Sequence, residues 1–413
     1  MTKAIGRRRV LGAGVGLAAG GLAMPAIGRA ATVYRIGILT DLTGPNSNSN
    51  GQGTVTGTHM AADDFMAANP DIKVEILVAD YQSKPDIATS IARDWIDRHN
   101  VSVISNVNNS AAALAVASLV REKNRAALFT GPASSDLTGK DCSPNHVHWT
   151  YDTWALGRCT GGALVAAGGT TWYFVAADYT FGKLLAHDTG QAVIAAGGKI
   201  LGTIYHPFPD TTDFSSFLLQ AKASGAKVIG LANSGDNTVN CVKQAREFGI
   251  TKDGTKLAAL LLTIPDVHAL GLTDAQGLIL TEAFYWDLNA DTRIFGHRFA
   301  KKMKGAMPNM LQAGDFSANT HMLKAAKVIG FDKAAKDGRA LIAQMKAMPT
   351  NDIAFGKGSI REDGRKLNPM YLFQVKSPAE SRYPWDYYKL VRTVPADQAF
   401  RPLDQGACPL VHA

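Results

Sequence analysis

The sequence predicts an α/β protein made of two similar halves, and three observations support this fold class. Short apolar strands alternate with amphipathic helices along most of the chain. The alternation pauses around Cys142–Cys159 and then restarts. Removing an export signal of residues 1–30 from the 413 residues leaves 383, which is long for one hydrophobic core and comfortable for two. Short strand–helix connections also predict parallel sheets with right-handed crossovers.

The first 30 residues have the layout of an export signal. A basic head that includes Arg7 and Arg8 precedes an apolar, Gly/Ala-rich stretch, and small residues end at Ala30. The apolar stretch is too short for a permanent membrane helix. The run Gly6–Leu11 favours the twin-arginine route, and the alternative is an ordinary secretory signal. We therefore expect a periplasmic protein whose signal is cleaved near Ala30.

Charge and hydropathy exclude two broad classes of partner. The formal charge is +8, but five of the basic residues lie in the first 30 residues, which carry no acid, so the mature chain is near +3. No strong basic stripe remains for nucleic acid. No later apolar run is long enough for a transmembrane helix, so we expect no stable membrane insertion.

Four cysteines follow the signal. Cys142 and Cys159 are close in sequence, and we expect a disulfide between them because an exported protein meets an oxidising compartment. The alternative is two unpaired thiols, since sequence alone does not give connectivity. Cys241 lies in a helical pattern and is expected to be buried, and Cys408 is its possible partner. The cysteine spacing gives no support for a zinc or redox site.

The first half is expected to alternate strands and helices up to the cysteine pair. Expected strands are Tyr34–Leu39, Lys73–Ala79, Val101–Ser105 and Ala126–Thr130. Expected helices are Gly51–Asn69, Ile87–Asn100 and Ala111–Lys123. His146 and His148 point to the same side of a further short strand, but no third metal ligand is evident nearby, so we expect no metal.

The second half repeats the pattern. Expected strands are Thr171–Ala176, Lys199–Tyr205, Lys227–Leu231, Lys256–Leu262 and Gly277–Glu282. Expected helices are Ala155–Ala167, Phe181–Ala196, Phe214–Ala223 and Thr238–Phe248, followed by Thr292–Lys304, Ser317–Gly330 and Arg339–Met348. Gly358–Arg361 and Met370–Lys376 flank Asp363-Gly364 and predict a strand–turn–strand.

Four stretches, taken in order, resemble the bacterial ABC-importer solute-binding proteins of the branched-chain amino acid (Leu/Ile/Val-binding) type. They are Ile36–Pro45, Ala79–Asp86, Val101–Ala111 followed by Gly131–Thr138, and Ala177–Gly182. The resemblance spans roughly residues 32–376. It implies the fold of a type I periplasmic binding protein, in which two Rossmann-like lobes are joined by three crossings and hold the ligand between them.

The resemblance also implies a division of the chain. The crossings would fall near Trp149–Thr153, Glu282–Trp286 and Phe355–Gly358. One lobe would comprise residues 32–150 and 285–354, and the other residues 151–284 and 355–376. Residues 377–413 would form a tail that packs along the surface.

Ligands of open parallel sheets bind beyond the carboxyl ends of the strands. The corresponding loops are Asn46–Gln52, Asn106–Ser110, Gly131–Ser135, Asp178–Phe181, Asn233–Asn237, Thr263–Asp266 and Phe284–Trp286. Free N–H groups where a helix begins at Asn108, Asn109 and Ser110 favour a carboxylate. The alternative role for Ser110 is a helix cap. Ala133 and Ser134 would offer one backbone and one hydroxyl contact, or form a solvated turn.

The opposite wall suggests the rest of the ligand. Asp236 or Asp266 would accept an α-ammonium group, although either one equally suits a helix cap. Tyr179, Phe181 and Trp286 would provide aromatic walls, or pack in the core. The stretch Ser134–Asp152 is similar to the subgroup that takes up aromatic carboxylates. The ligand is therefore expected to be an aromatic acid or a hydrophobic or branched-chain amino acid.

The expected function is capture of a small organic carboxylate for an inner-membrane ABC permease, without a cofactor and without chemical conversion. The mature chain has no nucleophile elbow and no glycine fingerprint for a cofactor. Two alternatives remain open at this point: an exported cofactor-containing enzyme, and a receptor that signals to a membrane protein.

Overall fold

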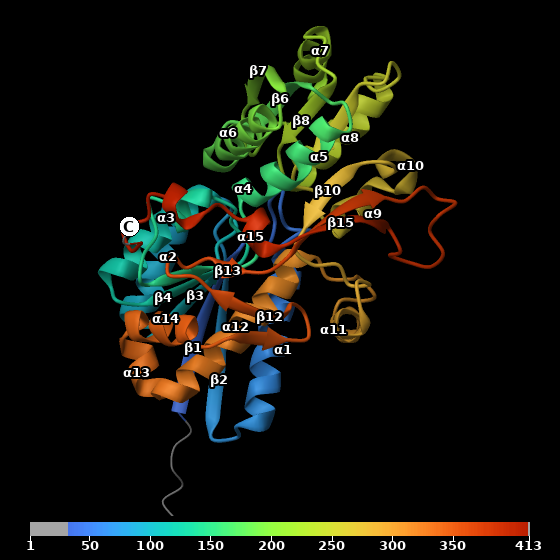
Figure 1. The fold of residues 1–413 in the computed structure, drawn as a ribbon. Coiled ribbons are helices and arrows are strands. Elements are labelled where there is room, and N and C mark those ends of the chain that lie inside the picture. Colours follow the sequence, from blue (N-terminus) through green and yellow to red (C-terminus); the bar gives the residue numbers. More distant parts are fainter. Residues whose placement is uncertain (1–31, 412–413) are drawn as a thin grey trace, which may run out of the picture. The chain divides into compact units, whose positions relative to one another are not determined.

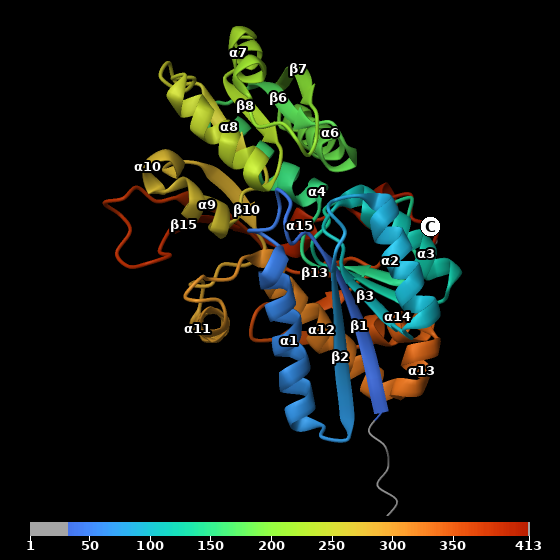
Figure 2. The ribbon, with the colours of Figure 1, turned by 180° about the vertical axis from the view of Figure 1, so that it is seen from behind.

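The structure is a computed structural model and describes residues 32–411. The expected export signal, with Arg7, Arg8 and the cleavage position near Ala30, lies outside these residues. Two large sheets dominate the described chain, and each is covered by helices (Figures 1 and 2). We call the five-stranded sheet with its helices lobe 1, and the seven-stranded sheet with its helices lobe 2.

Lobe 1 contains a wholly parallel sheet. Its strands, in spatial order, are β2 (Ile72–Asp80), β1 (Thr32–Thr40), β3 (Val103–Asn106), β4 (Ala126–Phe129) and β5 (His146–His148). The associated helices are α1 (Gly51–Ala68), α2 (Pro85–Arg98), α3 (Ser110–Glu122), the 3-10 helix η1 (Ser135–Thr138), α11 (Ala290–Lys302), α12 (Met310–Ile329), α13 (Phe331–Lys336) and α14 (Gly338–Ala347).

Apolar side chains cover both faces of this sheet. Trp95 of α2 and Val116 of α3 form one buried cluster, and Met322 of α12 and Leu341 of α14 belong to another. Gly37 of β1 permits this packing, because a Cβ there would lie 2.4 Å from the ring of Trp95. Parallel strands buried on both faces explain why they appear as continuous apolar runs in the sequence.

Lobe 2 contains a mixed sheet. Its strands, in spatial order, are β15 (Tyr388–Val394), β14 (Met370–Val375), β10 (Ile279–Glu282), β9 (Lys256–Ala259), β8 (Val228–Ala232), β6 (Thr171–Ala177) and β7 (Lys199–His206). The helices are α4 (Thr153–Leu156), the π-helical segment η2 (Gly157–Gly161), α5 (Gly162–Ala166), α6 (Thr180–Ala195), α7 (Ser215–Ala223), α8 (Gly235–Glu247), α9 (Ile264–Leu270) and α10 (Leu272–Ala275). Only β14 and β15 run antiparallel to their neighbours.

The expected strand–turn–strand near residue 364 is divided between two sheets. β12 (Gly356–Ile360) pairs with β13 (Lys366–Leu367) and with β11 (Thr350–Asp352) in a small antiparallel sheet. β14, the expected second arm, instead pairs with β10 of lobe 2. The sequence predicted the turn but not the partner of the later strand. The exact division of the chain into lobes stays a prediction.

The C-terminal segment has more structure than the sequence predicted. It supplies β15 to the edge of the lobe 2 sheet, then forms α15 (Ala396–Ala399) and the 3-10 helix η3 (Leu403–Gln405). In both ribbon views this red segment leads from β15 to the neighbourhood of α3 (Figures 1 and 2). The Nη2 of Arg401 donates to the carbonyl of Ser135 at 2.8 Å, so the segment is hydrogen-bonded to lobe 1.

The expected disulfide between Cys142 and Cys159 is wrong. Cys142 is bonded to Cys408, 266 residues away in the sequence, and Cys159 and Cys241 are free and buried. Cys159 lies in η2 of lobe 2 and belongs to the same buried cluster as Leu156 and Phe174, whereas Cys142 follows η1 in lobe 1. Sequence proximity was misleading because the chain leaves lobe 1 between the two residues.

Candidate functional site

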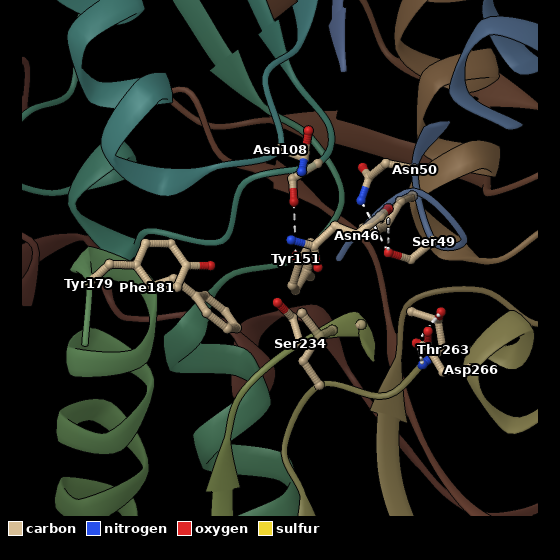
Figure 3. A pocket seen from close by; sticks show the side chains of 14 residues that line it. Asn46, Ser49, Asn50, Asn108, Tyr151, Tyr179, Phe181, Ser234, Thr263 and Asp266 are labelled. Atoms are coloured by element: carbon tan, nitrogen blue, oxygen red, sulfur yellow. Dashed lines mark hydrogen bonds between the residues drawn. The ribbon is translucent and has the colours of Figure 1, made fainter. Parts of the chain in front are cut away.

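A cavity lies where loops of the two lobes meet (Figure 3). The empty space is about 350 Å³, including the part open to solvent. Lobe 1 and its helices contribute Asn46, Ser49, Asn50, Asn108, Gly131, Tyr151 and Leu311. Lobe 2 contributes Tyr179, Phe181, Ser234, Gly235, Leu261, Thr263 and Asp266. Most of these residues follow the carboxyl ends of parallel strands, as expected for an open α/β sheet.

The start of α3 presents two polar atoms without a partner among the described residues. Asn109 caps the helix, because its side chain accepts from the N–H of Ala112 at 3.1 Å. Tyr81 donates its hydroxyl to Oδ1 of Asn108 at 2.8 Å and so fixes the orientation of that amide. The Nδ2 of Asn108 and the Oγ of Ser110 are buried and unpaired. Buried unpaired donors of this kind suit a hydrogen-bonding ligand.

The loop between β1 and α1 is held by a buried carboxylate. Asp41 accepts from the backbone N–H of Gly44 and of Asn46, both at 3.1 Å. Burial raises the pKa of Asp41, although these N–H groups oppose the rise. The neighbouring amide of Asn50 donates to the Oγ of Ser49 at 3.2 Å. These bonds fix the polar side of the cavity before any ligand binds.

Aromatic rings form another wall. Tyr179 stacks on Phe208 with ring centroids 4.1 Å apart, and Phe181 lies 5.9 Å from Tyr179. Tyr151 donates its hydroxyl to the carbonyl of Gly131 at 2.9 Å, so its ring is fixed. In Figure 3 the rings of Tyr179 and Phe181 lie on the side of the cavity away from Ser49 and Asn50. A flat or branched apolar group matches such a surface.

Asp266 provides an acidic group in the cavity. Its Oδ2 accepts from the N–H and the hydroxyl of Thr263 at 2.8 and 2.7 Å, which completes a capping box at the start of α9. Its Oδ1 is buried and has no partner within residues 32–411. Burial raises its pKa to about 6, and the bonds from Thr263 oppose that rise. None of the described residues that line the cavity is Lys or Arg.

The structure brings together four of the ten residues that the sequence singled out as ligand contacts. Asn108, Tyr179, Phe181 and Asp266 line the cavity. Whether they contact a ligand stays a prediction.

Six of the ten lie outside the cavity lining. Asn109 and Ser134 cap helices, and Ser110 is buried two positions beyond Asn108. Ala133 accepts from the N–H of Thr153, and Asp236 lies at the exposed rim. The Nε1 of Trp286 donates to the carbonyl of Trp385 at 3.0 Å, so the indole N–H already has a partner within the fold.

Sequence reasoning identified most of the loops but missed several of their residues. Asn46, Ser49, Asn50, Gly131, Ser234, Gly235 and Thr263 fall in loops expected to face the ligand. The available signal was a polar residue at the end of a strand. Adjacent polar residues of one loop carry the same signal, so the sequence does not show which of them faces the cavity. Leu311 had no such signal, because it belongs to the first turn of α12, which begins earlier than expected.

Two further findings concern other classes of site. The Nε2 of His146 donates to the carbonyl of Leu137 and the Nε2 of His148 donates to the carbonyl of Pro132, and burial lowers the pKa of both imidazoles. Within residues 32–411 no group of three metal-type side chains comes together. Over the same residues, no helix combines the length and apolar character that a membrane crossing requires.

The chain was compared with known families, curated proteins and solved structures. A profile of the periplasmic binding protein family matches residues 33–381. The comparison with curated proteins gave no match.

Solved structures provide close relatives. A periplasmic binding protein from Burkholderia mallei is 45% identical, with a TM-score of 0.88 over 92% of this chain and 99% of that chain. A branched-chain amino acid ABC transporter periplasmic ligand-binding protein from Burkholderia xenovorans LB400 is 36% identical, with a TM-score of 0.80 over 91% of this chain and 99% of that chain.

More distant structures share the fold. An ABC transporter solute-binding protein from R. palustris in complex with benzoate is 19% identical and has a TM-score of 0.80 over 92% of this chain and all of that chain. The family match covers most of the chain, and two relatives exceed one third identity over nearly their whole length. The chain therefore belongs to the periplasmic binding protein family, with the two-lobed α/β fold that the sequence predicted.

Proposed function

We propose that this protein captures a small organic carboxylate between its lobes and delivers it to an inner-membrane ABC permease. The observation that carries this proposal is a buried donor at the start of α3, the Nδ2 of Asn108, which lines the cavity and has no partner among the described residues. It lies at the N-terminus of a 13-residue helix, where the helix dipole favours negative charge. Neutral donors and the helix terminus would then bind the anion without a lysine or arginine.

The remainder of the ligand is proposed to be apolar. Tyr151, Tyr179 and Phe181 offer ring faces to it. The relative from Burkholderia xenovorans carries a branched-chain amino acid description, and solved structures with the same fold hold benzoate and 4-hydroxybenzoate. Both ligand classes combine one carboxylate with one apolar group.

Asp266 specifically favours an amino acid over an aromatic acid. Its free Oδ1 would accept a hydrogen bond from an α-ammonium group, and charge-assisted bonds of this kind are among the stronger ones. An aromatic acid has no such group and would place its own negative charge in a cavity that already holds this carboxyl. We therefore propose a hydrophobic amino acid as the first candidate and an aromatic acid as the second.

A thermal-shift panel tests the function and separates the two ligand classes. Leucine, isoleucine, valine and phenylalanine are compared with benzoate, 4-hydroxybenzoate and cinnamate, because a ligand selective for the folded state raises the melting temperature. Stabilisation by one class, and recovery of the compound unchanged after incubation, is the expected result. The absence of stabilisation by every compound, or recovery of a converted product, would contradict the proposed function.

Substitution at the start of α3 tests the carboxylate site. Asn108→Ala should weaken binding of the compound found in the panel at least tenfold, since it removes a donor to a charged group. Ser134→Ala is the matched control: Ser134 caps η1 by accepting from Asp136 and does not line the cavity. Equal effects of the two changes would show that the carboxylate binds elsewhere.

The export route also belongs to the proposal. Proteins of this family work in the periplasm, and we propose that Arg7 and Arg8 direct this chain through the twin-arginine route with cleavage near Ala30. Replacing both arginines by lysine should leave the precursor in the cytoplasm. The mass of the exported protein reports the cleavage position.

A further inference from the structure

The two lobes also touch backbone to backbone beside the cavity. The N–H of Asp236, in the first turn of α8 in lobe 2, donates to the carbonyl oxygen of Pro45 at 2.9 Å. Pro45 belongs to the loop between β1 and α1 in lobe 1. The first four N–H groups of a helix have no partner inside the helix. One such group of α8 thus finds its acceptor on the opposite lobe.

Gly235 makes this approach possible. Its φ is +52°, in the left-handed region that glycine adopts without a steric penalty. A Cβ at this position would lie 2.1 Å from the carbonyl oxygen of Pro45 and 2.9 Å from Oδ1 of Asn46. The nearer atom belongs to the backbone and cannot rotate away as a flexible side chain would. The contact between the lobes therefore depends on the absence of a side chain at Gly235.

The acceptor is held in place independently of the contact. Asp41, which is fully buried, binds the N–H groups on either side of Pro45, those of Gly44 and Asn46. The loop consequently has little freedom to move away from an added methyl group. Burial raises the pKa of Asp236 at the exposed rim, and the side chain of Asn48, in the same loop as Pro45, lies close enough to oppose that rise. We call Pro45, Asn48, Gly235 and Asp236 the rim contact.

We propose that the rim contact is a closing contact that stabilises the closed arrangement of the lobes, and that Gly235 is its positioning residue. The inference rests on the proposed function, because closure serves binding. The observed affinity of a two-state receptor is its intrinsic affinity scaled by the closed fraction. Weakening the rim contact should therefore reduce the affinity for all ligands by one common factor. Changing a residue that contacts the ligand should instead alter the ratio between ligands.

The first experiment needs no ligand. Gly235→Ala is compared with Gly225→Ala, a matched control in lobe 2 that also has positive φ, +72°, but has no atom within 4 Å of its added Cβ. Both changes lose the conformational freedom of glycine, and only the first obstructs the lobes. In the free protein, Gly235→Ala should accelerate amide hydrogen exchange at Asp236 at least tenfold and increase the radius of gyration measured by X-ray scattering.

The control separates closure from folding. Gly225→Ala should match wild type in exchange at Asp236 and in radius of gyration, and equal behaviour of the two alanine variants would overturn the proposal. If Gly235→Ala does not fold, Asn48→Ala decides, because it removes the side-chain contact with Asp236 without straining the backbone. It should shift the radius in the same direction by a smaller amount, and an unchanged radius would overturn the inference.

The second experiment uses the leucine and benzoate-type panel. Asn48→Ala, at a residue outside the cavity lining, should raise every measurable dissociation constant by the same factor, about threefold. Asn108→Ala should change the constants unequally. Unequal changes in Asn48→Ala would overturn the role of the rim contact in closure. If no compound binds wild type, the proposed function fails while the exchange and scattering results still decide whether the rim contact holds the lobes together.

Discussion

The hydrogen-bond partners of two buried carboxyl groups, Asp266 and Glu282, decide which of them is available to a ligand. Asp266 faces the cavity with one free oxygen, whereas both oxygens of Glu282 are hydrogen-bonded inside the fold. Tyr388 donates its hydroxyl to one Glu282 oxygen at 2.8 Å, and the N–H of Met310 donates to the other at 3.4 Å. The first carboxyl is therefore available to a ligand and the second is structural.

Asp266→Asn should reverse the preference between ligand classes. The change removes the negative charge opposite an α-ammonium group, so affinity for leucine-type ligands should fall at least tenfold while benzoate-type affinity stays or rises. In wild type, amino acid binding should weaken as the pH falls through about 6, where Asp266 takes up a proton. Calorimetric titration between pH 5 and 8 measures both effects. A loss shared equally by the two ligand classes would refute an ammonium contact.

Glu282 should make stability depend on pH. Burial raises its pKa from 4.5 to about 8, so the folded state keeps the proton over a range in which the unfolded chain has lost it. The resulting stabilisation is complete below pH 4.5 and is lost as the pH rises through 8. The side chain of Glu282→Gln is neutral at every pH, so the stability of this variant does not fall over that pH range. Its stability relative to wild type, measured by urea unfolding at pH 5, 7 and 9, should therefore increase with pH; a constant difference would contradict the assignment.

Residue types at strand ends could be predicted, but their orientations could not. The sequence identified the polar start of α3, and the structure shows that Asn108 reaches the cavity while Asn109 caps the helix. The sequence does not distinguish the two neighbouring asparagines, because either side chain could accept a hydrogen bond from a backbone N–H at the start of a helix. The hydroxyl of Tyr81 distinguishes them, since it binds both Asn108 and the N–H of Asn109, and that contact spans 27 residues.

At the scale of elements, α12 illustrates a missed signal. We expected this helix to begin at Ser317, and it begins at Met310. Asn309 and Gln312 form a capping box, a pattern visible in the sequence. Gly314 and Asp315 obscured it, because a glycine followed by an acid resembles a loop. In the fold, Gly314 lets Thr150 approach, and Asp315 is buried next to Thr130 and Asn106.

The cap of α12 should matter more than an ordinary cap. Asn309 is fully buried, accepts from the N–H groups of Leu311 and Gln312, and donates to the carbonyl of Ser49, whose residue lines the cavity. Asn309→Ala should cost about 2 kcal/mol and also weaken ligand binding. Asn289→Ala, which removes the exposed capping box of α11, should cost about 1 kcal/mol and leave binding unchanged. Denaturant unfolding and ligand titration compare the two, and equal costs would argue against the link to Ser49.

At the scale of the whole described chain, the sequence predicted the alternation of strands and helices but not the path of the C-terminal segment. Alternation follows from local periodicity, which each stretch carries by itself. The pairing of β15 with β14 and the bond between Cys142 and Cys408 depend on contacts between distant segments. Nothing near Cys408 in the sequence indicates which thiol it meets. The two-lobed architecture was correct because it needs only the count and order of elements.

The disulfide should contribute measurably to stability. Cys142→Ser together with Cys408→Ser should lower the unfolding free energy by about 2–5 kcal/mol, because the bond closes a very long loop of the unfolded chain. Cys159→Ala is the control, since that thiol is buried but free. Melting curves under oxidising and reducing conditions should differ for wild type and coincide for the double variant. A double variant as stable as wild type would show that non-covalent contacts alone hold the C-terminal segment.

The distance of 266 residues between the bonded cysteines has a consequence for how the protein matures. The chain is synthesised from its N-terminus, so Cys159 is the first cysteine to appear after Cys142. Cys241 follows, and Cys408 appears only near the end of synthesis. The correct bond thus requires that the earliest thiol stay reduced, or be reshuffled, until the last segment arrives. A chain that folds before export, as the proposed twin-arginine route requires, meets the oxidising compartment with Cys142 already beside Cys408.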